Sequence, residues 1–196
     1  MVNLYMQLVA SAAARKGSAA LFTRDRQVTY EDLLEDVNRF ARALSSAGVR
    51  RGDAVAILLP NCPEFTVSYY GAVAVGAMCV PANPLLKPGE LVYIWNDSRA
   101  RVVVTTPVLL PGVLDAKRQV PTLSHVVVVG PVSTAGVSSF ADLMNAQPDR
   151  SPLNVEGLDP DEPVVCIYTS GTEGRPKGAL LSHRNLVSNC DQVGRA

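Results

Sequence analysis

Apolar residues recur along this chain at two spacings, one typical of helices and one typical of buried strands. Between residues 29 and 48 the positions that recur on one helical face are Leu33, Val37, Phe40 and Leu44. Thr29 is a suitable N-cap for such a helix, and Gly48 is a suitable residue just beyond its end. We therefore predict a helix whose apolar face packs into a core.

Short runs rich in apolar and β-branched residues indicate strands, and they are separated by segments with helical spacing. The expected strands are 54–59, 78–80, 101–105, 125–129 and 164–167. The expected helices between them begin at Pro63, at Pro88 and after Pro107, the last being interrupted at Pro111-Gly112. Strands that are apolar on both faces and alternate with helices predict an α/β fold with a mostly parallel sheet covered by helices.

The remaining segments complete the predicted organisation. The chain should open with an amphipathic helix and a hairpin over residues 20–29, and Ser182 should cap a last helix with Leu186, Cys190 and Val193 on one face. We expect an α/β unit at residues 1–146 and a proline-rich linker at 147–163. Residues 164–196 should hold a strand, a loop and the last helix.

The loop at residues 168–178, with the sequence YTSGTEGRPKG, carries the strongest chemical signal. Its glycines let backbone N–H groups approach anionic oxygens, and its hydroxyls and cations add donors, so it suits a polyphosphate. One alternative is a surface hairpin turn, which is also rich in Gly and Pro. A Walker A loop is excluded, because Pro176 stands where its second glycine belongs and Gly178 follows Lys177.

This loop resembles the phosphate-binding signature of the adenylate-forming superfamily, which includes acyl- and aryl-CoA synthetases, luciferases and peptide-synthetase adenylation domains. The segments 59–65, 80–85, 90–94 and 179–186 are similar to those of fatty acyl-CoA ligases, so the resemblance covers roughly residues 20–196. It implies the N-terminal part of the ligase fold, truncated after the phosphate-binding loop. It also implies ATP, Mg²⁺ and coenzyme A as co-substrates and cofactor.

The resemblance assigns the loop to ATP and its pyrophosphate. The residues so assigned are Thr169, Ser170, Gly171, Thr172, Glu173, Gly174 and Lys177. Glu173 departs from the family's usual Thr or Ser, and a carboxylate repels phosphate unless it points outward or faces Mg²⁺; we favour the outward position. Arg175 either contacts phosphate or is solvated. His183 is interpreted as a residue of the helix's first turn that packs or hydrogen-bonds locally.

Within this family a carboxylate attacks the α-phosphorus of ATP to give an acyl-adenylate and pyrophosphate, and a thiol then takes the acyl group. The resemblance implies such an acid–thiol ligase with a fatty acid as the leading substrate; aryl acids and a carrier-protein thiol remain alternatives. The family's later motifs and C-terminal lid are missing here, so we expect catalytic residues elsewhere and an inactive isolated chain. A non-catalytic nucleotide-binding or assembly module is the alternative from another class.

Composition narrows the remaining possibilities. The chain has 196 residues, of which 47% are hydrophobic, with a net charge of +0, which argues against a nucleic-acid partner. Prolines break the uncharged stretch at residues 65–86, so we expect no transmembrane segment. The four cysteines and two histidines match no metal motif and indicate buried, reduced thiols in the cytoplasm. Apolar surface exposed by truncation would favour a homo-oligomer.

Overall fold

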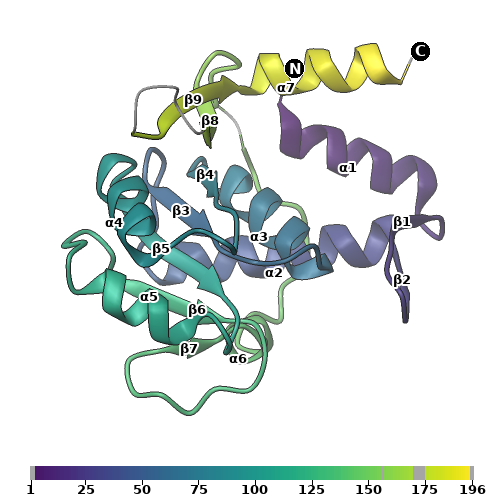
Figure 1. The fold of residues 1–196 in the computed structure, drawn as a ribbon. Helices are drawn as coiled ribbons and strands as arrows, with labels where there is room; N and C mark the ends of the chain where they lie inside the picture. Colours follow the sequence, from purple (N-terminus) through teal and green to yellow (C-terminus); the bar gives the residue numbers. More distant parts are fainter. Residues whose placement is uncertain (1–2, 156, 170–174, 195–196) are drawn as a thin grey trace.

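The structure is a computed structural model that describes residues 3–155, 157–169 and 175–194. Its centre is a seven-stranded sheet in the order β7-β6-β5-β3-β4-β8-β9 (Figure 1). The strands of this sheet are β3 (Ala54–Ile57), β4 (Met78–Pro81), β5 (Ala100–Thr105), β6 (His125–Val128), β7 (Ser138–Ser139), β8 (Pro163–Thr169) and β9 (Lys177–Ser182). All neighbours pair in parallel except β8 and β9, which are antiparallel.

Helices cover both faces of the sheet, as the apolar strands require. The described helices are α1 (Leu4–Arg15), α2 (Tyr30–Ser46), α3 (Pro63–Ala74), α4 (Pro88–Asp97), α5 (Leu110–Lys117), α6 (Phe140–Asn145) and α7 (His183–Val193). One buried cluster joins the sheet to α1, α2, α3, α6 and α7, and the other joins it to α4 and α5 (Figure 1). The short hairpin β1 (Ala19–Phe22) and β2 (Gln27–Thr29) lies apart from the sheet.

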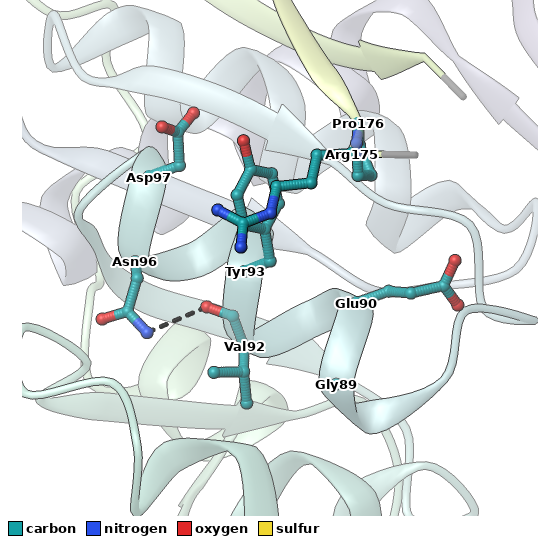
Figure 2. A pocket seen from close by; sticks show the side chains of 8 residues that line it. All are labelled: Gly89, Glu90, Val92, Tyr93, Asn96, Asp97, Arg175 and Pro176. Carbon is teal, nitrogen blue, oxygen red and sulfur yellow. Dashed lines mark hydrogen bonds between the residues drawn. The ribbon is translucent and has the colours of Figure 1, made fainter. Parts of the chain in front are cut away.

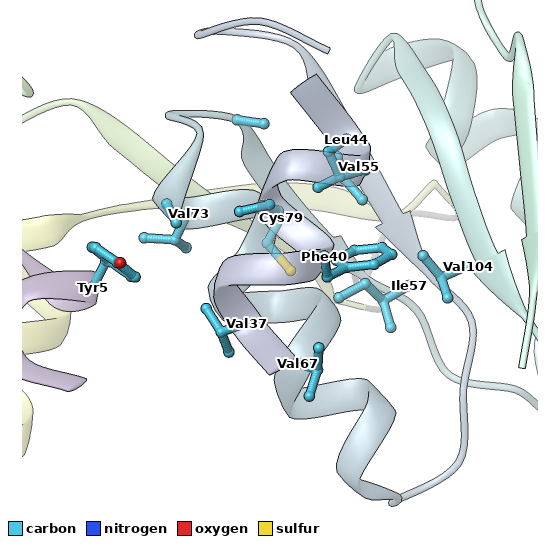
Figure 3. Close-up of a cluster of buried hydrophobic side chains, with 14 of the residues drawn as sticks. Tyr5, Val37, Phe40, Leu44, Val55, Ile57, Val67, Val73, Cys79 and Val104 are labelled. Carbon is cyan, nitrogen blue, oxygen red and sulfur yellow. The ribbon is translucent and has the colours of Figure 1, made fainter. Parts of the chain in front are cut away.

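Phe40 of α2 is central to the larger of the two clusters. Its side chain is fully buried beside Ile57 and Val104 of the sheet and Val67 of α3 (Figure 3). Its ring stacks on that of Phe140, with centroids 4.9 Å apart. A Cβ added to Gly71 of α3 would lie only 2.7 Å from Phe40 Cδ1, so the absence of that Cβ allows α3 to approach α2 closely.

The predicted α/β class and mostly parallel sheet are confirmed, and most predicted helices and strands are present. The residues predicted to mark the two ends of α2 are confirmed as well. The Thr29 hydroxyl accepts the Asp32 N–H at 3.1 Å, and Gly48 has a φ of +80° just beyond the helix. The predicted interruption at Pro111-Gly112 is wrong, because Pro111 falls in the first turn of a continuous α5, where a proline removes no helical hydrogen bond.

Two other expectations are wrong. The strand expected at residues 54–59 is β3, which ends at Ile57 rather than Leu59. The elements β7, α6 and β9 were not predicted. The inward residues of α7 are His183 and Val187, with Leu186 partly buried, whereas Val193 is 70% exposed. The predicted face thus shares Leu186 with the observed one, but the most deeply buried positions of α7 are His183 and Val187.

Candidate phosphate-binding site

The candidate loop leaves β8 at the carboxyl edge of the parallel strands. Ligands of open α/β sheets bind beyond this edge, since the strand ends and the loops that follow them gather there. Thr169 ends β8, and Lys177 begins β9 directly opposite it in the antiparallel ladder. Directly opposed residues project their side chains to the same face of a sheet, and both residues are exposed. A hydroxyl and an ammonium group therefore flank the loop on one side.

Five of the predicted site residues lie outside the described residues, namely Ser170, Gly171, Thr172, Glu173 and Gly174. The expected outward position of Glu173 therefore stays a prediction. The two described members, Thr169 and Lys177, are brought together by the β8–β9 pairing. The loop thus joins two antiparallel strands, which is the geometry of the hairpin alternative, while its donor-rich composition is what favours phosphate.

Tyr168, the residue before Thr169, ties the loop to the helical layer. Its hydroxyl donates a 2.6 Å hydrogen bond to Asp97 Oδ2 at the end of α4. Burial, followed by this bond, raises the pKa of Tyr168, so the phenol stays a donor at physiological pH. Gly178 stands opposite Tyr168 in the ladder. A Cβ at Gly178 would lie 2.7 Å from Cys166 Sγ and 3.1 Å from Tyr168 Cζ.

We expect Gly178→Ala to lower the free energy of unfolding by about 1–3 kcal/mol, the usual cost of overpacking. The added methyl group would have to displace either the Cys166 side chain or the ring of Tyr168. Urea unfolding followed by circular dichroism measures the change. Gly89→Ala is a suitable control, because nothing lies within 4 Å of a Cβ there. Equal effects of the two substitutions would contradict the packing argument.

Arg175, at the other end of the loop, lies over an aromatic ring. Its guanidinium carbon is 5.9 Å from the ring centroid of Tyr93 on α4, a cation–π geometry (Figure 2). Both residues line an open cavity of about 700 Å³ between α4 and the loop, together with Gly89, Glu90, Val92, Asn96, Asp97 and Pro176. The sequence indicated only phosphate or solvent as partners of Arg175; Tyr93 lies 82 residues earlier, and the pattern of the loop gives no sign of it.

His183 is a fully buried residue at the start of α7. Its Nδ1 accepts the backbone N–H of Leu4 at 3.2 Å, and its Nε2 has no hydrogen-bond partner among the described residues. The predicted packing is confirmed, but the hydrogen bond reaches the N-terminal helix rather than a local group. Burial lowers the pKa of His183, and the nearby charge of Glu162 opposes this only in part.

This lowered pKa makes stability depend on pH. As the pH falls below the ordinary value of 6.5, the unfolded chain binds a proton at His183 before the folded chain does. The contribution of His183 is therefore fully present above pH 6.5 and declines as the pH falls toward the folded-state pKa. We expect His183→Asn, which keeps an acceptor near the Nδ1 position, to lose less stability than the wild type between about pH 7.5 and pH 5. Urea midpoints across this range measure the difference; parallel profiles would contradict it.

The four cysteines differ in their exposure to solvent. Cys79 and Cys166 are buried, Cys62 is half-buried, and Cys190 is exposed, so the expectation of buried thiols is wrong for Cys190. Among the described residues, no group of three or more His, Cys, Asp or Glu is placed to hold a metal ion. In the described part of the chain, no helix combines the length and apolar character needed to cross a bilayer.

Residues 8–196 match the family of AMP-binding enzymes, and the chain belongs to this family. It is 38% identical over 161 residues to a crotonobetaine/carnitine–CoA ligase of Salmonella arizonae, covering 81% of this chain and 31% of the relative. It is 31% identical over 212 residues to a long-chain-fatty-acid–CoA ligase of Bacillus subtilis, covering 94% of this chain and 37% of the relative. The chain thus spans about a third of the length of these relatives.

The fold is also that of solved ligases in this family. The crystal structure of the anthranilate CoA ligase AuaEII in complex with anthranoyl-AMP superposes with a TM-score of 0.88 at 35% identity. The match covers 93% of this chain and 35% of that one. The α/β architecture predicted from the sequence is therefore the architecture of adenylate-forming CoA ligases.

Proposed function

We propose that this chain supplies the phosphate loop of an ATP-dependent acid–CoA ligase. The observation that carries the proposal is the register of β8 and β9, which sets Thr169 opposite Lys177 at the carboxyl edge of the sheet. Hydroxyl and ammonium donors on one face suit the phosphate oxygens of ATP. Family membership and the relatives' printed activities support the same reaction class.

In the proposed reaction the carboxylate of the acid attacks the α-phosphorus, forming an acyl-adenylate and releasing pyrophosphate; coenzyme A then takes the acyl group. The leaving pyrophosphate would be held, and its developing charge neutralised, by Lys177 and Thr169 together with Ser170, Gly171, Thr172 and Gly174 of the loop. Mg²⁺, which prefers oxygen ligands, would supply further neutralisation of the phosphate charge when bound. This chain's own contribution is to bind and orient the leaving group.

We further propose a fatty acid as the substrate and the cytoplasm as the site of action. The similarity of residues 83–94 and 182–186 to fatty acyl-CoA ligases supports the substrate, as does the long-chain-fatty-acid–CoA ligase among the relatives. Ligases named for carnitine and for anthranilate are similar to the chain as well, so the acid is the part of the proposal that most needs a test.

The deciding experiment uses the protein at its native length, captured from its source with an antibody against this chain. ATP–pyrophosphate exchange is measured with a fatty acid, anthranilate or crotonobetaine as the acid. We expect exchange that depends on the acid and is fastest with the fatty acid, and none by the isolated 196-residue chain. Exchange only with another acid would overturn the substrate, and exchange with none would overturn the ligase.

A further inference from the structure

Helix α4 contacts both ends of the candidate loop through two residues on one of its faces. Tyr93 and Asp97 are four positions apart, the spacing that brings side chains together on a helix surface. Asp97 accepts the hydroxyl of Tyr168, just before the loop. Tyr93 lies beneath the guanidinium of Arg175, just before Pro176 and Lys177.

We propose that Tyr93 and Asp97 are positioning residues that hold the two ends of the phosphate loop in place. The proposal deepens the proposed function and rests on it for the ligand. We call the contacts of Tyr93 with Arg175 and of Asp97 with Tyr168 the α4 clamp. Figure 2 shows that Tyr93, Asp97 and Arg175 lie along the same cavity.

The position of Asp97 at the end of α4 indicates that its carboxylate serves the contact with Tyr168 rather than the stability of the helix. It is the last residue of α4, where the helix dipole disfavours a negative charge. The 2.6 Å bond from the Tyr168 hydroxyl compensates that charge and falls in the range of strong O–H···O⁻ bonds. The ring can reach Asp97 because it passes over Gly178, where no Cβ stands in its way.

Fixing both ends of the loop would matter for affinity. Thr169 follows Tyr168 directly, and Lys177 is two residues beyond Arg175, so each clamp contact lies next to a proposed phosphate donor. A loop that is ordered before it binds loses less conformational entropy on binding, and its ligand is held more tightly. The α4 clamp would thus contribute to pyrophosphate binding without touching the ligand.

Hydrogen exchange of the 196-residue chain tests the clamp without any ligand. Tyr168→Phe removes only the hydroxyl, and Asp97→Ala removes its acceptor. We expect each to speed exchange of peptides 164–169 and 175–182 by about five- to tenfold, the loss of one hydrogen bond at a partly exposed site. The double variant should add nothing further, because both changes break the same contact. Asp97→Asn should stay close to wild type, because its amide oxygen can still accept.

Tyr5→Phe is the matched control. The Tyr5 hydroxyl also donates a buried 2.6 Å bond, to Asn38, but lies in the other helical layer. This variant should lower thermal stability and leave exchange in the two peptides unchanged. Unchanged exchange in Tyr168→Phe and Asp97→Ala, or equal acceleration in Tyr5→Phe, would overturn the clamp.

The affinity for magnesium pyrophosphate, measured by titration calorimetry, separates the clamp from the proposed function. We expect Tyr168→Phe and Asp97→Ala to weaken binding about five- to tenfold, and Asp97→Asn to restore it. If the wild type does not bind pyrophosphate while exchange responds as stated, the proposed function fails and the structural clamp stands. Wild-type affinity in both variants would overturn the clamp's role in binding.

Discussion

Lys177→Ala should weaken the binding of magnesium pyrophosphate to this chain by about 10- to 100-fold, the loss expected for one charge-assisted contact. Lys177 opens β9 opposite Thr169, and its side chain is exposed, so no packing is lost with it. The melting temperature should therefore stay nearly constant while affinity falls. Titration calorimetry and a thermal melt on the same preparation measure both quantities.

Lys16→Ala is the control for this substitution. The Lys16 side chain is 69% exposed and forms only a loose 3.9 Å ion pair with Glu31, beyond the end of α1. It removes the same charge from another part of the surface, so binding should change by less than about twofold at physiological salt. Equal loss of affinity in the two variants would mean that net charge, rather than a site at Lys177, governs binding.

Phe40→Ala should lower the free energy of unfolding by about 3–5 kcal/mol, the usual cost of removing a buried phenylalanine. The ring is fully buried, stacks on Phe140, and meets α3 where Gly71 lets the two helices approach. Relaxation cannot readily fill the space, because sheet and helices enclose the ring on several sides (Figure 3). Urea unfolding with an unchanged slope measures this loss.

Phe22→Ala provides the comparison, since Phe22 at the end of β1 is 73% exposed. The same atoms are removed, but little surface leaves water on folding, so the change should stay within about 0.5 kcal/mol. A small effect at Phe40, similar to that at Phe22, would contradict the assignment of Phe40 to the core.

The fold was predictable where one local signal determined an element. The apolar, β-branched run 102–104 is typical of a strand in a covered sheet. Thr29 and Gly48 mark the two ends of α2, the first by a capping hydrogen bond and the second by a positive φ. The strand β9 was missed because its side chains are mostly exposed and its pairing with β8 is a tertiary fact. The predicted helix break at Pro111 was wrong because a proline interrupts a helix only beyond its first turn, and Pro111 lies within the first turn of α5.

The residue types of the site were predictable from the sequence, but the contacts that position them were not. Glycines, hydroxyls and Lys177 within one short segment indicate phosphate chemistry from sequence alone. That Lys177 stands opposite Thr169 follows from strand pairing, and that Asp97 holds Tyr168 follows from the packing of α4, 71 residues earlier in the chain. His183 shows the same limit, since its partner Leu4 lies 179 residues away.

The most direct test of the central claim is a ³¹P NMR titration of magnesium pyrophosphate with the wild-type 196-residue chain, with ATP and AMP as competitors. A loop that grips the leaving pyrophosphate of ATP predicts saturable binding that ATP displaces and AMP, which lacks the β- and γ-phosphates, does not. Absence of binding at millimolar pyrophosphate, or displacement by AMP as effective as by ATP, would contradict the assignment of residues 169–177 to pyrophosphate.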